Sequence, residues 1–147
     1  MRKALAYPLT VVYYLAFLTS LLVFHAIQWA CYYAFGNQAH KWSVNLLNAT
    51  LIGCLGLIGT KISFSNPHKL RNDKPHIIVC NHQSLYDIPP LIWYLRKIHP
   101  KFISKKELGR GIPSVSFNLR HGGSLLIDRN KPNDALVAIE DYATVLN

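Results

Sequence analysis

The apolar residues of the chain are concentrated in its first 60 positions. Residues 4–40 contain no Lys, Arg, Asp or Glu, and residues 42–60 contain none either, so Lys41 alone separates two apolar runs. Each run reaches the roughly 20 residues that a helix needs to cross a bilayer core of about 30 Å. The pattern predicts a membrane-associated helical hairpin over residues 1–61.

The make-up of the two runs favours an anchor over a cleaved leader. The first run is too long for a secretory signal peptide, and its Tyr and Trp residues lie mostly near its ends, as interfacial aromatic residues do. The second run is less apolar, and Ala49, Gly53 and Gly56 offer a surface of small residues for close contact with the first. The sequence leaves open whether the hairpin spans the membrane or enters one leaflet.

Basic residues flank the predicted hairpin and predict its orientation. By the positive-inside bias, both ends lie on the cytoplasmic side of an inner or cytoplasmic membrane, and the rest of the chain faces the cytoplasm. The flanking residues are Arg2, Lys3, Lys61, Lys69, Arg71 and Lys74.

The remainder of the chain carries a local excess of positive charge. The formal net charge is +9, and residues 96–131 hold nine Lys or Arg against Glu107 and Asp128. Anionic lipid headgroups or a phosphorylated substrate explain this excess on a tethered domain more simply than nucleic acid does. A solvated face without a function is the plain alternative.

Beyond residue 61, short apolar runs alternate with helical periodicity. After a polar link over residues 62–75, punctuated by Pro67 and Pro75, the pattern predicts an α/β layer with a parallel sheet. Because about 85 residues give a thin core for such a layer, we expect residues 62–147 to be the N-terminal part of an incomplete α/β domain. The predicted strands are residues 76–80, 101–104 and 124–128, and the predicted helices are residues 91–98 and 131–146, the second with Asp134 as N-cap.

The stretch CNHQSLYD, residues 80–87, holds the clearest candidate chemistry. His82 lies at the end of a predicted strand, and one turn of the following helix returns the Asp87 side chain toward it. A carboxylate that accepts a hydrogen bond from one ring nitrogen leaves the other free to take a proton, which is general-base chemistry. The motif alone is weak, because a chance His-x4-Asp is expected in roughly a third of such chains. Its position at the end of a predicted strand, next to Asn81, strengthens the interpretation.

Two other interpretations of this stretch are weaker. Ser84 as a nucleophile with His82 as its base is disfavoured, since residues two apart on a short loop align poorly and no G-x-S-x-G turn is present. A metal site built from His82, Cys80 and Asp87 is disfavoured because no second His or Cys cluster supplies more ligands. We therefore expect no metal and no cofactor.

Three ordered blocks resemble the glycerolipid acyltransferases. The blocks are NHQSLYD at residues 81–87, SKKELGRGIP at residues 104–113 and GGSLLIDRN at residues 122–130. They are most similar to those of the 1-acyl-sn-glycerol-3-phosphate acyltransferases, which convert lysophosphatidic acid to phosphatidic acid. With the hydrophobic amino-terminal part, the resemblance covers nearly the whole chain.

The resemblance implies a role for each matching residue. His82 would take the proton of the sn-2 hydroxyl of lysophosphatidic acid, which then attacks the thioester of acyl-CoA or of an acyl carrier protein. Asp87 would orient the imidazole. Arg129 would bind the acceptor phosphate, Gly123 would let the backbone approach it, and Lys105 is a further candidate contact. The implied partners are membrane phospholipid and these substrates, and not nucleic acid.

The sequence departs from the family pattern near its end. A third block of the kind Phe-Pro-Glu-Gly-Thr-Arg and a fourth block with a proline are missing, so we expect a chain truncated before the third motif. The missing blocks would help to position the substrate. An alternative expectation is therefore a truncated, catalytically inactive, membrane-bound lipid-binding protein.

Overall fold

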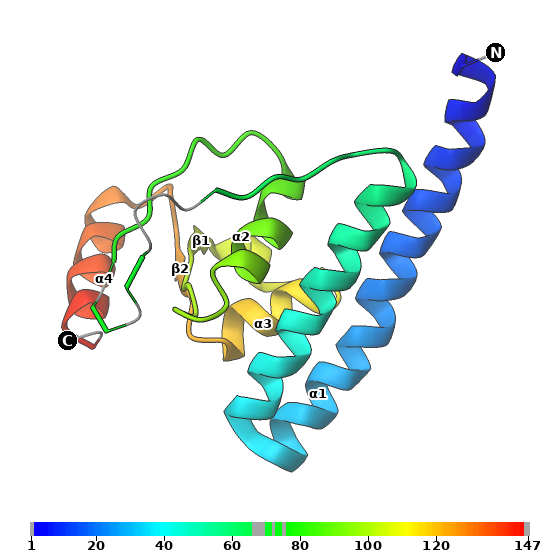
Figure 1. Ribbon diagram of the computed structural model, residues 1–147. Coiled ribbons are helices and arrows are strands. Elements are labelled where there is room, and N and C mark those ends of the chain that lie inside the picture. The colour runs from blue at the N-terminus through cyan, green and yellow to red at the C-terminus, as the bar shows by residue number, and fades with distance from the viewer. Residues whose placement is uncertain (1, 66–69, 72, 75, 146–147) are drawn as a thin grey trace. The chain divides into compact units, whose positions relative to one another are not determined.

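A computed structural model describes residues 2–65, 70–71, 73–74 and 76–145 of the chain (Figure 1). These residues form two compact units. The first unit contains Met1–Ser20 and Asn45–Pro100, and the second contains Leu21–Val44 and Lys101–Asn147. Pro67, Lys69 and Pro75, which the sequence places in the polar link, lie outside the described residues.

The longest element is helix α1, Arg2–Leu57, which is interrupted at Gly36. Gly36 has φ 79° and ψ −169°, a conformation that a residue without Cβ adopts without steric cost. Ser20 Oγ lies 3.9 Å from Cys54 Sγ, although a straight helix would separate residues 34 apart by about 50 Å. The helix therefore folds back at Gly36, and Figure 1 shows its two arms side by side. By length and composition, it is apolar enough to cross a membrane.

In the first unit, the two arms of α1 share a small core with residues that follow the helix. Tyr13, Cys54 and Leu55 are buried there, and Tyr86 packs against them. The Tyr86 ring lies 5.9 Å from that of Tyr13 and 6.2 Å from that of Phe17, in edge-on geometry that aromatic rings favour. Tyr86 thus fixes against α1 the loop that carries the candidate residues.

The prediction of a strand at residues 76–80 is wrong. These residues are extended but unpaired, and Ile77 and Val79 are 96% and 91% exposed. A strand is stable only when a neighbour takes its backbone hydrogen bonds, and none of the described residues does so. The chain then forms a 3₁₀ turn, η1, at Leu85–Asp87 and helix α2 at Ile88–Tyr94, which starts and ends earlier than predicted.

The second unit contains the sheet. Strand β1, Ile103–Lys105, pairs in parallel with β2, Leu125–Ile127, and between them lie the 3₁₀ turn η2, Lys106–Gly109, and helix α3, Val115–His121. Two strands at the predicted positions thus pair in the predicted parallel sense. The α/β layer is small, however, and the described residues are mostly helical.

Helix α4, Pro132–Val145, ends the described chain. Asp134 lies within its first turn and is not its N-cap, so that prediction is wrong. The helix starts earlier because the fixed φ of Pro132 suits a first helical position.

Candidate functional site

His82 and Asp87 lie in contact. Nδ1 of His82 is 3.2 Å from Oδ2 of Asp87, and the two side chains are 51% and 38% exposed. Both belong to the first unit, in the loop that leads into η1 and α2. The pair is open to solvent on one side, as a site for an incoming substrate must be.

A capping box holds Asp87 in place. Its Oδ2 accepts hydrogen bonds from the backbone N–H groups of Ser84 and Gln83, each at 2.8 Å. Ser84 Oγ in turn accepts from the N–H of Tyr86 at 3.3 Å, which completes the reciprocal cap of η1. The N–H groups of Ser84 and Gln83 lower the pKa of Asp87, and contact with His82 lowers it further. Asp87 is therefore a fixed anion, and the Ser84 hydroxyl serves as a cap.

The contact with Asp87 selects a tautomer of His82. A carboxylate accepts the Nδ1–H, so the lone pair of the neutral ring lies on Nε2. Within the described residues, Nε2 makes no hydrogen bond, and the ring is exposed. Such an imidazole can remove a proton from a hydroxyl that approaches Nε2.

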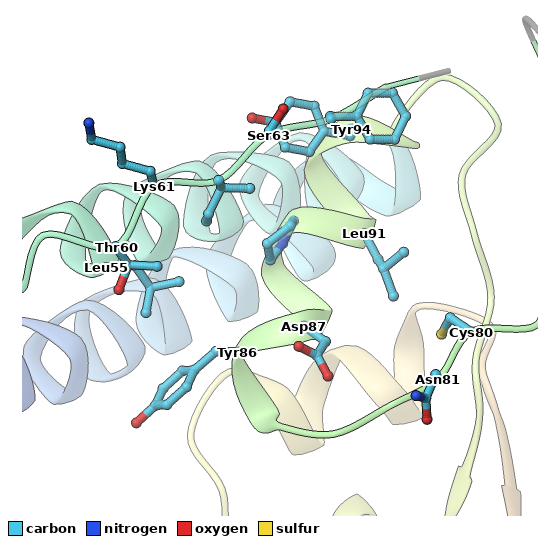
Figure 2. Close-up of a pocket in the computed structure, with 13 residues that line it drawn as sticks. Leu55, Thr60, Lys61, Ser63, Cys80, Asn81, Tyr86, Asp87, Leu91 and Tyr94 are labelled. Carbon is cyan, nitrogen blue, oxygen red and sulfur yellow. The ribbon is translucent and has the colours of Figure 1, made fainter. Parts of the chain in front are cut away.

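A pocket of about 460 Å³ in the first unit is lined by Asp87 of this pair. Figure 2 shows Asp87 and Asn81 at one end of it and Ser63 and Tyr94 at the other. The rings of Phe64 and Tyr94 stack in its wall with their centroids 4.7 Å apart. The sequence does not predict this pocket, because Phe64 and Tyr94 are 30 positions apart and no local pattern pairs them.

The other candidate residues belong to the second unit. Lys105 ends β1, and Arg129 follows the end of β2 by two residues, so both exposed cations lie at the carboxyl edge of the parallel pair. This edge is where open α/β sheets bind ligands. In the register of the sheet, Lys105 is opposite Ile127.

Gly123 lies in the turn before β2, and its φ of 78° favours glycine. A Cβ at this position would meet Nζ of Lys101 at 3.1 Å. Lys101 also donates to the carbonyl oxygen of Gly122, and the Tyr142 hydroxyl donates to that of Gly123. No sequence pattern identifies Lys101, because only the folded turn brings it to these glycines.

The residues of the described chain offer no metal centre. They contain no group of three or more His, Cys, Asp or Glu side chains that lie close enough to hold an ion.

A comparison with protein families matches the part of the chain that carries these residues. The model described as Acyltransferase matches residues 61–147, which is more than half of the chain. The chain belongs to the acyltransferase family. Its acyltransferase domain includes the His82–Asp87 pair, the sheet and the two glycines of the turn. No curated protein and no solved structure gave a match.

Proposed function

We propose that this acyltransferase moves an acyl group from a thioester of CoA or of an acyl carrier protein to the sn-2 hydroxyl of lysophosphatidic acid. The product would be phosphatidic acid, a precursor of phospholipids. The observation that carries the proposal is the contact between His82 and the capped carboxylate of Asp87 within an acyltransferase domain.

In the proposed reaction, Nε2 of His82 takes the hydroxyl proton while the oxygen attacks the thioester carbonyl. The new C–O bond forms, the C–S bond breaks, and the thiolate leaves with the proton that His82 returns. Asp87 holds the ring in the required tautomer and stabilises the imidazolium that forms. No covalent intermediate on the protein and no metal is needed for this sequence of steps.

The acceptor phosphate would bind at the carboxyl edge of β1 and β2. Arg129 offers a planar guanidinium that binds phosphate oxygens in pairs, and Lys105 adds a second charge at the same edge. Gly123 would let the backbone approach the phosphate, since it has no side chain to block it.

The proposed location is the cytoplasmic face of an inner or cytoplasmic membrane. Residues 1–61 would be the membrane-associated part and residues 62–147 the acyltransferase part. The apolar surface of α1, on which Tyr14, Leu18, Leu22 and Leu46 are more than half exposed, supports this location. An acceptor with an acyl chain would reach the domain from the same membrane.

The test is an acyl-transfer assay with purified chains in lipid vesicles. The measured quantity is the phosphatidic acid that forms from a labelled acyl thioester. His82→Ala should abolish transfer and leave membrane binding unchanged. His76→Ala is the matched control, because His76 is an exposed histidine that contacts Arg71 and not Asp87. Transfer retained in His82→Ala would refute the mechanism. Membrane binding without transfer in every variant, the parent chain included, would favour the lipid-binding alternative.

A further inference from the structure

In the second unit, a group of basic side chains surrounds the ring of Phe117. His40 and His121 both contact this ring, with centroids 5.5 and 4.4 Å away. They also contact Tyr32, at 5.6 and 4.7 Å. The rings therefore form one cluster that joins the end of α3 to the turn half of α1, which is the part at Leu21–Val44.

Two lysines add charge to this cluster. Lys41 follows His40 on α1. Burial lowers the pKa of His40, and the charges of His121 and Lys101 lower it further. Burial lowers the pKa of Lys101, and the charge of Lys41 lowers it further. The hydrogen bond from Lys101 to Gly122 fixes its side chain beside His121. Like charges held together in this way favour an anion as neighbour.

His40 supplies a separate indication of a ligand. Its side chain is only 3% exposed, and its Nε2 has no hydrogen-bond partner among the described residues. Buried polar atoms are nearly always hydrogen-bonded, because leaving one unsatisfied costs free energy. In the neutral ring of His40, a proton on Nε2 would make this nitrogen a donor to an anion that the two lysines hold.

We propose that Lys41, Lys101, His40 and His121 bind a phosphate group. Binding at this cluster does not depend on the acyl transfer proposed above, although Lys101 also donates to the carbonyl oxygen of Gly122. Its phosphate belongs either to an anionic phospholipid or to free phosphate, and the surroundings favour the lipid. Next to Lys41, Trp42 is 69% exposed, and Phe35 at the fold-back is 76% exposed, as is typical of residues at a membrane interface.

The experiment compares lipid binding by the full chain and three double variants in neutral detergent. Native mass spectrometry counts the phosphatidylglycerol and phosphatidylcholine molecules that stay bound, and competition with inorganic phosphate separates the two sources. Lys41→Gln with Lys101→Gln removes the proposed charges. Lys97→Gln with Lys106→Gln removes the same total charge from exposed positions outside the cluster.

The parent chain and the control pair should retain one phosphatidylglycerol in preference to phosphatidylcholine. The cluster pair should bind it roughly thirtyfold more weakly, since each lysine near an anionic lipid contributes about fivefold. Lys41→Arg with Lys101→Arg keeps the charges and should keep the preference, which separates loss of charge from loss of folding. Displacement by inorganic phosphate at matched concentration would identify free phosphate as the ligand. The proposal would be overturned if the parent chain and the Lys41→Gln, Lys101→Gln variant bound phosphatidylglycerol equally well. It would also be overturned if both cluster variants and the control variant lost binding to the same extent.

Discussion

The backbone N–H of Ser114 donates a hydrogen bond to Nδ1 of His25 across 89 positions of sequence, at 3.1 Å. Ser114 is fully buried, and its hydroxyl donates to the carbonyl oxygen of Leu21 at 2.8 Å. Its φ of 61° is uncommon for a residue with a side chain. These two bonds secure the start of α3 against α1. Because Nδ1 of His25 is the acceptor in the first of them, the ring proton lies on Nε2.

The first prediction concerns this hydrogen bond. His25→Leu removes the acceptor and leaves the buried N–H of Ser114 unsatisfied, which should cost about 1–3 kcal/mol of unfolding free energy. His25→Gln keeps an oxygen acceptor and should recover part of the loss. Thermal unfolding in detergent micelles measures both variants. Equal stability of His25→Leu and the parent chain would show that the bond contributes nothing.

The second prediction concerns the carboxylate of Asp87. Asp87→Asn removes the charge that fixes the His82 tautomer, and acyl transfer should fall by roughly a hundredfold or more. The rate at saturating substrate should change more than the Michaelis constant, because in the proposed reaction His82 would act on the hydroxyl and not on the phosphate. Asp141→Asn, on the exposed face of α4, is the matched control and should be unaffected. Similar losses in both variants would mean that the effect is not specific to the pair.

The third prediction follows from the pKa of Asp87, which lies below its usual value of 3.8 because Ser84 and Gln83 donate to the carboxylate. A lowered pKa in the folded state means that the ionised carboxylate stabilises the loop. That contribution is present at a pH above the pKa of Asp87 in the unfolded chain. It is lost as the pH falls through the lowered pKa of Asp87 in the folded chain. The amide proton shifts of Gln83 and Ser84 in NMR spectra should therefore titrate together below pH 3.8. A midpoint above 3.8, or the same titration in Asp87→Asn, would contradict this.

The sequence predicted those parts of the fold that depend on local pattern. Charge-free runs identified the apolar helix, and the alternation of apolar runs and turns located β1 and β2 within a residue or two. The six-residue block from His82 to Asp87 was sufficient to bring these side chains together, because a capped turn is a local structure.

The rest depends on contacts between distant positions. Ile77 and Val79 have the composition of a strand, but pairing requires a neighbour that no local pattern reveals. The contact of Tyr86 with Tyr13, and that of Ser114 with His25, join residues more than 70 positions apart. Lys101 was missed for the same reason, since its neighbours Gly122 and Gly123 come 21 and 22 positions later.

The last prediction concerns how α1 meets the membrane, which its apolar pattern leaves open. In the second unit, Phe117 of α3 packs on Tyr32 and His40, so one side of the turn half of α1 is covered by protein. A hairpin that crossed the bilayer would place its turn on the far side from the domain that carries α3. We therefore expect α1 to enter one leaflet, with its turn on the same side of the membrane as the domain.

Labelling with a membrane-impermeant maleimide tests this placement. Asn37→Cys, beside the turn and exposed, should react in inverted membrane vesicles and stay unlabelled in intact cells, after Cys31, Cys54 and Cys80 are replaced by serine. A chain that keeps only Cys80, which is exposed in the domain part, is the reference for the cytoplasmic side. If Asn37→Cys and Cys80 are both labelled in inverted vesicles and both unlabelled in intact cells, α1 enters one leaflet. Labelling of Asn37→Cys from outside intact cells would instead establish that the hairpin spans the bilayer and that α3 does not pack on it in the membrane.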